Sequence, residues 1–132
     1  MRALVDTSVW SLSLRKERPA EHPTVAKLTS MLQTDEDVFL IGLILQEILQ
    51  AFRSDSSFRR VARHLEPFPL LELERGDFIE AATLHRKCAA RGLSVSTADC
   101  QIAQAAIRHA CQLLTADKDF ERIAHYSELK LA

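Results

Sequence analysis

Glycine, cysteine and long apolar runs are scarce in this sequence of 132 residues. The three glycines form neither a GxxxxGK[ST] nor a GxGxxG motif, so the two common nucleotide-binding loops are missing. The five histidines show no HxxxH or HExxH spacing, which disfavours a zinc hydrolase. No stretch approaches the ~18 consecutive apolar residues that a membrane span needs. We therefore expect a protein with no nucleotide cradle, zinc motif or membrane anchor.

The cysteines are too few and too scattered for a disulfide framework. Cys88, Cys100 and Cys111 are odd in number, form no CxxC pair and fall within apolar patterns. They are therefore interpreted as reduced packing residues of an intracellular protein. The chain also reaches an acidic residue, Asp6, too early for a signal peptide, so we expect a cytoplasmic location.

The charge balance permits a nucleic-acid partner without arguing for one. The chain has 18 acidic and 17 basic residues. Setting aside four acids that are nominated below as metal ligands leaves 18 − 4 = 14 acidic residues, which are fewer than the 17 basic residues. With 47% hydrophobic residues, no repeat and no linker, residues 1–132 are expected to form one domain around one core.

Short apolar runs alternate with helical patterns along the chain. Strands are expected at residues 2–5, 38–41, 70–73, 112–115 and, as an edge, 129–131. Between them lie helical patterns, among them a long helix that Asp77 is expected to cap and Gly92 to end. Apolar strands without two-residue alternation indicate a parallel sheet that is covered on both faces. The prediction is a three-layer α/β/α sandwich with a four- or five-stranded parallel sheet, and a helical bundle is the alternative.

Four acids should meet at one edge of such a sheet. Asp6 and Asp117 follow the first and fourth strands, so both lie at the carboxyl edge. Right-handed crossovers start the intervening helices at that same edge. Glu47 lies about one turn into one such helix, and Asp99 lies in the first turn of another. Open α/β folds bind their ligands at this edge.

Four adjacent carboxylates need something to offset their repulsion, which is roughly 3 kcal/mol per pair at about 5 Å and an effective dielectric near 20. Protonation or a divalent cation would do so, and an all-oxygen ligand set favours Mg²⁺ or Mn²⁺. Such ions activate water for cleavage of phosphodiesters. Taken singly, each acid also has another explanation: Asp6 and Asp117 as helix caps, Asp99 as a partner of the helix dipole, and Glu47 as a solvated side chain.

Four segments taken in order resemble the PIN-domain family, and VapC-like toxins most of all. They are residues 4–8 (LVDTS), 46–49 (QEIL), 97–103 (TADCQIA) and 114–120 (LTADKDF). The resemblance implies cleavage of RNA at a Mg²⁺ or Mn²⁺ site. The acids of that site would be Asp6, Glu47, Asp99 and Asp117.

The resemblance also covers three auxiliary positions. Ser8 and Thr115 match hydroxyl positions that orient carboxylates or the metal's water in such proteins, although a turn or cap role suits them equally. Asp119 is either an additional outer acid or, as its place two residues after Asp117 favours, a surface cap.

Partners are implied in the same way, since VapC-like toxins bind an antitoxin helix and commonly pair with themselves. We predict a homodimer that binds a VapB-like antitoxin, with a basic side chain of the partner reaching the acids. The expected contact surface is apolar and comprises Trp10, Leu12, Leu14, Leu43, Ile44, Ile48 and Phe52.

Basic residues suited to RNA phosphates occur in two places. One set lies in the loop after the first helix and the other in or beside the middle helix, and the alternative for both is a solvated basic face. The residues are Arg15, Lys16, Arg18, Arg53, Arg59, Arg60 and Arg63.

Two other functions are alternatives to that of an RNA-cleaving toxin. The protein could be a PIN-like binding module that does not cleave, or a structure-specific DNA nuclease. A haloacid dehalogenase type of phosphatase would need an acid where Ser8 stands, and a receiver domain would need an acidic pair that is missing here.

Overall fold

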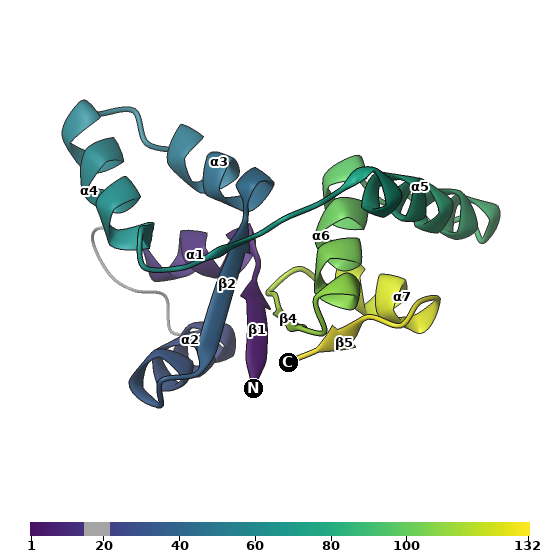
Figure 1. The fold of residues 1–132 in the computed structure, drawn as a ribbon, viewed down its shortest axis with the longest axis horizontal. Helices are drawn as coiled ribbons and strands as arrows, with labels where there is room; N and C mark the ends of the chain where they lie inside the picture. The colour runs from purple at the N-terminus through teal and green to yellow at the C-terminus, as the bar shows by residue number, and fades with distance from the viewer. Residues whose placement is uncertain (15–21) are drawn as a thin grey trace.

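A computed structural model describes residues 1–14 and 22–132, which form a parallel sheet with helices on both faces (Figure 1). The elements of the first half are β1 (Arg2–Val5), α1 (Thr7–Ser13), α2 (Pro23–Gln33), β2 (Asp37–Ile41), α3 (Gly42–Gln50), α4 (Asp55–Leu65) and β3 (Leu70–Leu71). The second half contains α5 (Arg75–Ala90), α6 (Thr97–Arg108), β4 (Gln112–Leu114), α7 (Asp119–His125) and β5 (Lys130–Leu131). The predicted α/β class is confirmed, with five strands.

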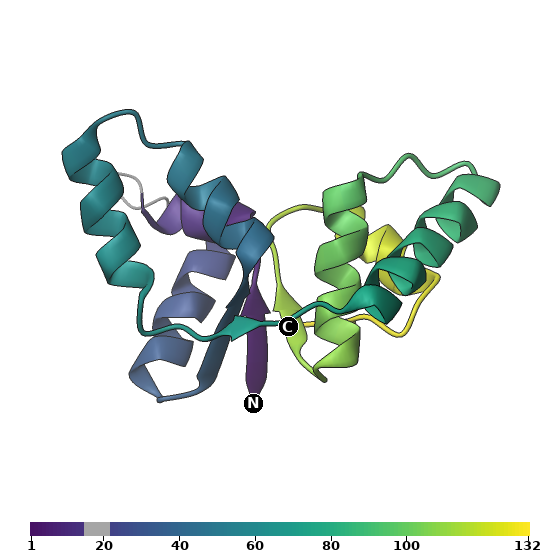
Figure 2. The same ribbon diagram turned by 45° about the horizontal axis from the view of Figure 1, so that its top comes forward.

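The strand order places a change of direction beside β1. The order is β3-β2-β1-β4-β5, and each neighbouring pair is parallel. The chain moves outward from β1 to β3, returns to β4 on the other side of β1, and then continues to β5. Right-handed crossovers in opposite directions place α1–α4 on one face and α5–α7 on the other, as Figures 1 and 2 show. The carboxyl ends of β1 and β4 therefore flank the switch point where ligands bind in such folds.

The core fills both spaces between sheet and helices. The strand residues 3–5 and 113–114 are fully buried, and Trp10 and Phe120 are the largest side chains packed against the sheet layers. The three cysteines are free and buried, as the sequence predicted. Burial raises the pKa of the Cys100 thiol to about 11, with smaller contributions from Cys88 and Asp99. The described residues include no helix long and apolar enough to cross a membrane.

Several boundaries differ from the sequence prediction. The basic middle helix, for which the sequence pattern predicts residues 58–65, begins at Asp55, because the Ser54 hydroxyl accepts a hydrogen bond from the amide of Ser57. The third strand contains two residues instead of the expected four.

The predicted cap of α5 was wrong. Glu74 is the N-cap, and Asp77 lies three residues later, where its carboxylate accepts a hydrogen bond from the Glu74 amide at 2.8 Å. Gly92 does follow the helix, with a φ of 75° that suits glycine.

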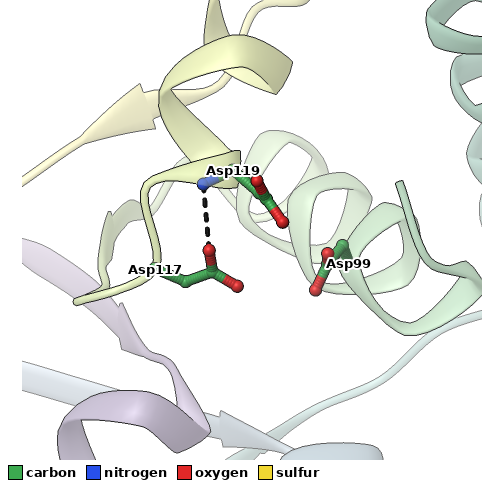
Figure 3. Close-up of side chains that lie close together, drawn as sticks. All are labelled: Asp99, Asp117 and Asp119. Carbon is green, nitrogen blue, oxygen red and sulfur yellow. Dashed lines mark hydrogen bonds between the residues drawn. The ribbon is translucent and has the colours of Figure 1, made fainter. Parts of the chain in front are cut away.

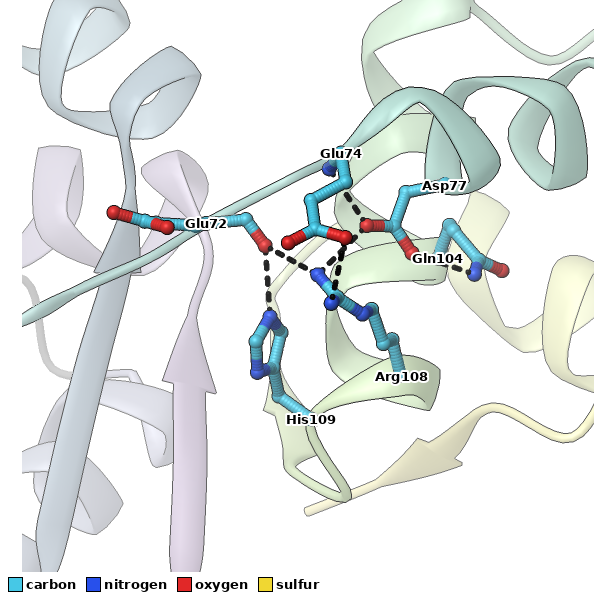
Figure 4. Close-up of polar contacts among 6 residues, drawn as sticks. All are labelled: Glu72, Glu74, Asp77, Gln104, Arg108 and His109. Atoms are coloured by element: carbon cyan, nitrogen blue, oxygen red, sulfur yellow. Dashed lines mark hydrogen bonds and ion pairs between the residues drawn. The ribbon is translucent and has the colours of Figure 1, made fainter.

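Asp77 belongs to a polar cluster that fastens the segment between β3 and α5 to the end of α6 (Figure 4). The Arg108 guanidinium donates to Asp77 Oδ2 at 2.9 Å and to the Glu72 carbonyl at 3.0 Å. The His109 ring donates to the same carbonyl at 2.8 Å, and Gln104 donates to Asp77 Oδ1 at 3.3 Å. Asp77 is only 5% exposed, so this paired carboxylate holds α5 to α6 from inside the protein.

The apolar contact surface predicted from sequence is largely part of the core. Trp10, Ile44 and Ile48 are buried, because α1 packs against α2 and α3 while α3 packs against α4. These four helices cover one another as well as the sheet. Leu12, Leu14, Leu43 and Phe52 remain partly exposed.

Candidate metal centre

Asp6 lies directly after β1 and is held by three hydrogen bonds. Its Oδ1 accepts from the Thr7 amide at 2.8 Å, and its Oδ2 accepts from the hydroxyls of Ser8 at 2.7 Å and Thr115 at 2.9 Å. Asp6 is 5% exposed and is also the N-cap of α1. A capping role and a place at the carboxyl edge of the sheet thus occur together in this residue.

The two predicted hydroxyl residues connect the ends of β1 and β4. Besides contacting Asp6, the Ser8 hydroxyl accepts from the Ala116 amide at 3.0 Å, and the Thr115 hydroxyl accepts from the Asp117 amide at 3.0 Å. Because each hydroxyl donates to Asp6 and accepts from the chain after β4, the positions of Asp6 and Asp117 are coupled.

Three acids form a close cluster beside this network (Figure 3), called here the acidic trio. Asp99 comes from the first turn of α6, Asp117 follows β4, and Asp119 begins α7. One carboxylate oxygen from each lies within 4.8 Å of the others. The Asp119 amide donates to Asp117 Oδ1 at 2.9 Å, which fixes the turn between these two acids.

Asp119 has two roles in this arrangement. It is the first residue of α7 and pairs with Arg122 at 3.1 Å, but Lys118 is the N-cap of that helix, so the cap role favoured from sequence is wrong. Its carboxylate also faces Asp99 and Asp117, so the structure brings it into the acidic trio as well.

The electrostatics of the trio disfavour three negative charges. Burial raises the pKa of Asp99 above its ordinary value, and the charges of Asp117 and Asp6 raise it further. Hydrogen bonding from Ser96, which caps α6, opposes this effect. A divalent cation would relieve the same repulsion, and carboxylate oxygens are the donors that Mg²⁺ and Mn²⁺ prefer. The donor set of the trio therefore fits such an ion.

Glu47, the fourth predicted acid, is not part of the trio. It lies in α3, and its Oε1 accepts a hydrogen bond from the Thr7 hydroxyl at 2.9 Å. Sequence reasoning missed Thr7, although a hydroxyl residue beside Asp6 at the first position of a helix was a usable signal. Of the four predicted acids, the structure groups Asp99 and Asp117 directly and keeps Asp6 and Glu47 close to Thr7.

The predicted RNA-binding residues are only partly described. Arg15, Lys16 and Arg18 lie outside the described residues. Arg53, Arg59, Arg60 and Arg63 are all exposed, on α4 or just before it.

Arg60 also lines a hollow of about 330 Å³ between α1, α3 and α4. Leu14, Ile48, Ala51 and Phe52 give this hollow an apolar floor. It lies on the helices that carry Thr7 and Glu47.

Comparison with known proteins agrees with this geometry. The sequence profile of the family described as PIN domain matches residues 3–126. VapC ribonuclease Mb1587 from Mycobacterium bovis and ribonuclease VapC11 from Mycobacterium tuberculosis are each 30% identical over 131 residues, which cover 98% of this chain and 96% of theirs. The crystal structure of VapBC2 from Rickettsia felis bound to a DNA fragment from their promoter matches with a TM-score of 0.79. That match has 16% identity and covers 100% of this chain and 98% of that chain.

Proposed function

Because this chain belongs to the PIN-domain family, we propose that it is a metal-dependent endoribonuclease and the toxin of a VapBC-type toxin-antitoxin pair, with residues 1–132 as one domain. The observation that carries the proposal is the acidic trio beside a hydrogen-bonded Asp6 at the carboxyl edge of the sheet. The relatives named as ribonucleases match over nearly the whole chain, which supports RNA as the substrate.

Each acid has a distinct part in the proposed site. Asp99 and Asp117, with Asp119 as the auxiliary acid, would hold Mg²⁺ or Mn²⁺, and Asp6 and Glu47 complete the ligand set. A bound ion of this kind supplies an activated water and stabilises negative charge on a phosphoryl oxygen. Ser8 and Thr115 keep Asp6 from turning away, since both hydroxyls donate to its Oδ2.

Cleavage of labelled RNA by the purified protein tests the proposal. Activity should require Mg²⁺ or Mn²⁺, vanish in EDTA, and fall at least ~100-fold in Asp99→Asn and Asp117→Asn, which corresponds to about 2.7 kcal/mol. Asp35→Asn, at an exposed acid in the turn between α2 and β2, is the matched control and should retain activity. Full activity in EDTA would exclude the metal mechanism. Retention of function by Asp99→Asn would favour the binding module, and preference for DNA in a parallel assay would favour the DNA nuclease.

The exposed arginines support an RNA-binding face. Arg59, Arg60 and Arg63 have the spacing of one helix face, opposite the buried Val61 and Leu65. Exposed guanidinium groups bind phosphates without reading sequence. We assign α4 to binding the RNA backbone, together with Arg53 and, outside the described residues, Arg15 and Lys16.

The hollow beside α4 suits the proposed antitoxin. Its apolar floor and the Arg60 guanidinium at its wall fit a helix that presents an apolar side chain next to a carboxylate. A basic side chain of that partner would reach the nearby acids. A toxin of the proposed kind cleaves the RNA of its own cell, so we propose that this protein is located in the cytoplasm.

The exposed apolar residues of α5 suit self-association. Phe78 and Ile79 are 47% and 59% exposed; Ile79 lies on the side of α5 away from the buried Ala81 and Leu84, and Phe78 lies beside Ala81 at the edge of the buried face. Glu80 and Lys87 lie seven residues apart and therefore on one flank of the helix. In a twofold antiparallel pair of α5 helices, each Glu80 would lie opposite the Lys87 of the other copy. We therefore place the predicted homodimer contact on α5, instead of on Trp10 and its buried neighbours.

A further inference from the structure

Thr7 is the one residue whose hydrogen bonds, among the described residues, reach both of the acids that lie outside the acidic trio. Its amide donates to Asp6 Oδ1 at 2.8 Å, and its hydroxyl donates to Glu47 Oε1 at 2.9 Å. The first contact is local, whereas the second joins residues 40 positions apart in sequence. Thr7 thus links the end of β1 to α3 through two carboxylates.

The contact with Glu47 is not needed to start helix α1. Asp6 already caps that helix through the Thr7 amide, and a threonine hydroxyl at the first helical position can face solvent at little cost. Thr29 and Thr83, within α2 and α5, donate their hydroxyls to the carbonyls four residues before them in their own helices. The Thr7 hydroxyl instead donates across to another element.

Glu47 is the acid that depends most on this bond. Asp6 accepts three hydrogen bonds, and Asp117 is fixed by the Asp119 amide. Within the part of the chain that the structure describes, the hydrogen bond recorded for Glu47 comes from Thr7 alone. A long, half-buried glutamate would otherwise sample several rotamers, and ordering it costs entropy when a ligand binds.

We propose that Thr7 is a positioning residue that holds the Glu47 carboxylate toward the metal site, with Oε1 occupied by the hydroxyl and Oε2 left to bind. The inference rests on the proposed function, because it assumes that the acids bind a divalent cation. Residues that orient metal ligands by hydrogen bonds change metal affinity or activity by about 10- to 100-fold when they are replaced.

Mn²⁺ binding in the absence of RNA tests the inference directly, with free Mn²⁺ measured by electron paramagnetic resonance. Thr7→Val keeps the shape of the side chain and removes the hydroxyl, so Mn²⁺ affinity should fall about 10-fold. Thr7→Ser keeps the hydroxyl and should restore most of the affinity. Thr83→Val, the same change on the exposed face of α5, should leave it unchanged. Thr7→Ala serves as a second variant that lacks the hydroxyl and favours the helix.

A double-mutant cycle shows whether Thr7 acts through Glu47. In a Glu47→Gln background, Thr7→Val should have little further effect on Mn²⁺ affinity. An equal loss in both backgrounds would overturn the inference, as would unchanged affinity in Thr7→Val and Thr7→Ala. A protein that shows the expected Mn²⁺ pattern but cleaves no RNA would refute the ribonuclease and leave the positioning role intact. A wild-type protein that binds no Mn²⁺ would refute both.

Discussion

The acidic trio predicts that removing one of its charges stabilises the metal-free protein. At 4.8 Å, two unit charges repel by about 0.9 kcal/mol in a water-like dielectric and by about 3.5 kcal/mol at an effective dielectric of 20. Asp99 is only half-buried, so the lower end of this range applies. Asp99→Asn should therefore raise the free energy of unfolding by about 1 kcal/mol, which is roughly 3–5 °C in Tm for a chain of this size.

The pH dependence of this gain has a definite sign. Burial, followed by the charges of Asp117 and Asp6, raises the pKa of Asp99 above its ordinary value of 3.8. The folded state therefore favours the protonated carboxyl, and stability is lost as the pH rises from 3.8 through the raised pKa. The stabilisation in Asp99→Asn should be complete at neutral pH and should shrink as the pH falls toward 3.8.

Asp77→Asn is a matched control with the opposite expectation. Burial alone would raise the pKa of Asp77, but the Glu74 amide, the Gln104 amide and the Arg108 charge together lower it. This carboxylate stabilises the fold above pH 3.8 and loses that effect as the pH falls through its lowered pKa. Asp77→Asn should therefore reduce the free energy of unfolding by about 2 kcal/mol at neutral pH.

Thermal melts followed by circular dichroism in EDTA, from about pH 4 to about pH 8, measure both variants. A lower Tm for Asp99→Asn at neutral pH, or shifts of both variants in one direction, would refute the electrostatic reasoning. Adding Mg²⁺ should then raise the Tm of the wild-type protein more than that of Asp99→Asn, because the variant loses a ligand. Asp6 is unsuitable for this test, because its oxygens accept three hydrogen bonds that an asparagine would partly lose.

Three further predictions concern substrate, partners and thiols. Replacing Arg59 and Arg63 by alanine should weaken RNA binding for all sequences alike and flatten its salt dependence in filter-binding assays, and an unchanged salt slope would assign them to solvent. Co-expression with the product of the adjacent open reading frame should give a complex on size exclusion that suppresses cleavage, whereas Phe78→Ser with Ile79→Ser should reduce self-association. A protein that is monomeric, active and indifferent to that neighbour would contradict the partner assignment. The cysteine thiols should resist alkylation at pH 8 until the protein is unfolded, because burial raises their pKa values, that of Cys100 to about 11; rapid labelling of the native protein would show that they are accessible.

The sheet and its acidic edge could be read from the sequence because both follow from backbone geometry. Apolar runs define parallel strands, and parallel strands bring their carboxyl ends to one edge. That rule was enough to place Asp6, Asp99 and Asp117 at one edge of the sheet, since each lies within a few residues of an element boundary.

Contacts between distant side chains could not be read in this way. The bonds of Thr7 to Glu47 and of Arg108 to Asp77 join residues 40 and 31 positions apart, and their formation depends on rotamers and helix packing. The buried state of Trp10 also depends on packing, because it requires four helices on one face to cover one another. Periodicity indicates that a helix has an apolar face, but it does not show what covers that face.

The position of β1 at the centre of the sheet also sets when the protein can act during its synthesis. β1 pairs with β4, so the first strand made must wait for residues 112–114 before its second neighbour exists. At about 5–20 residues per second, translation of the intervening segment takes roughly 5–20 s. Until then Asp6 has no Thr115 to hold it, and Asp99 has neither Asp117 nor Asp119 beside it. A nascent chain therefore lacks the acidic trio until β4 and the start of α7 have been made, so the proposed cleavage of nearby RNA cannot begin before that point.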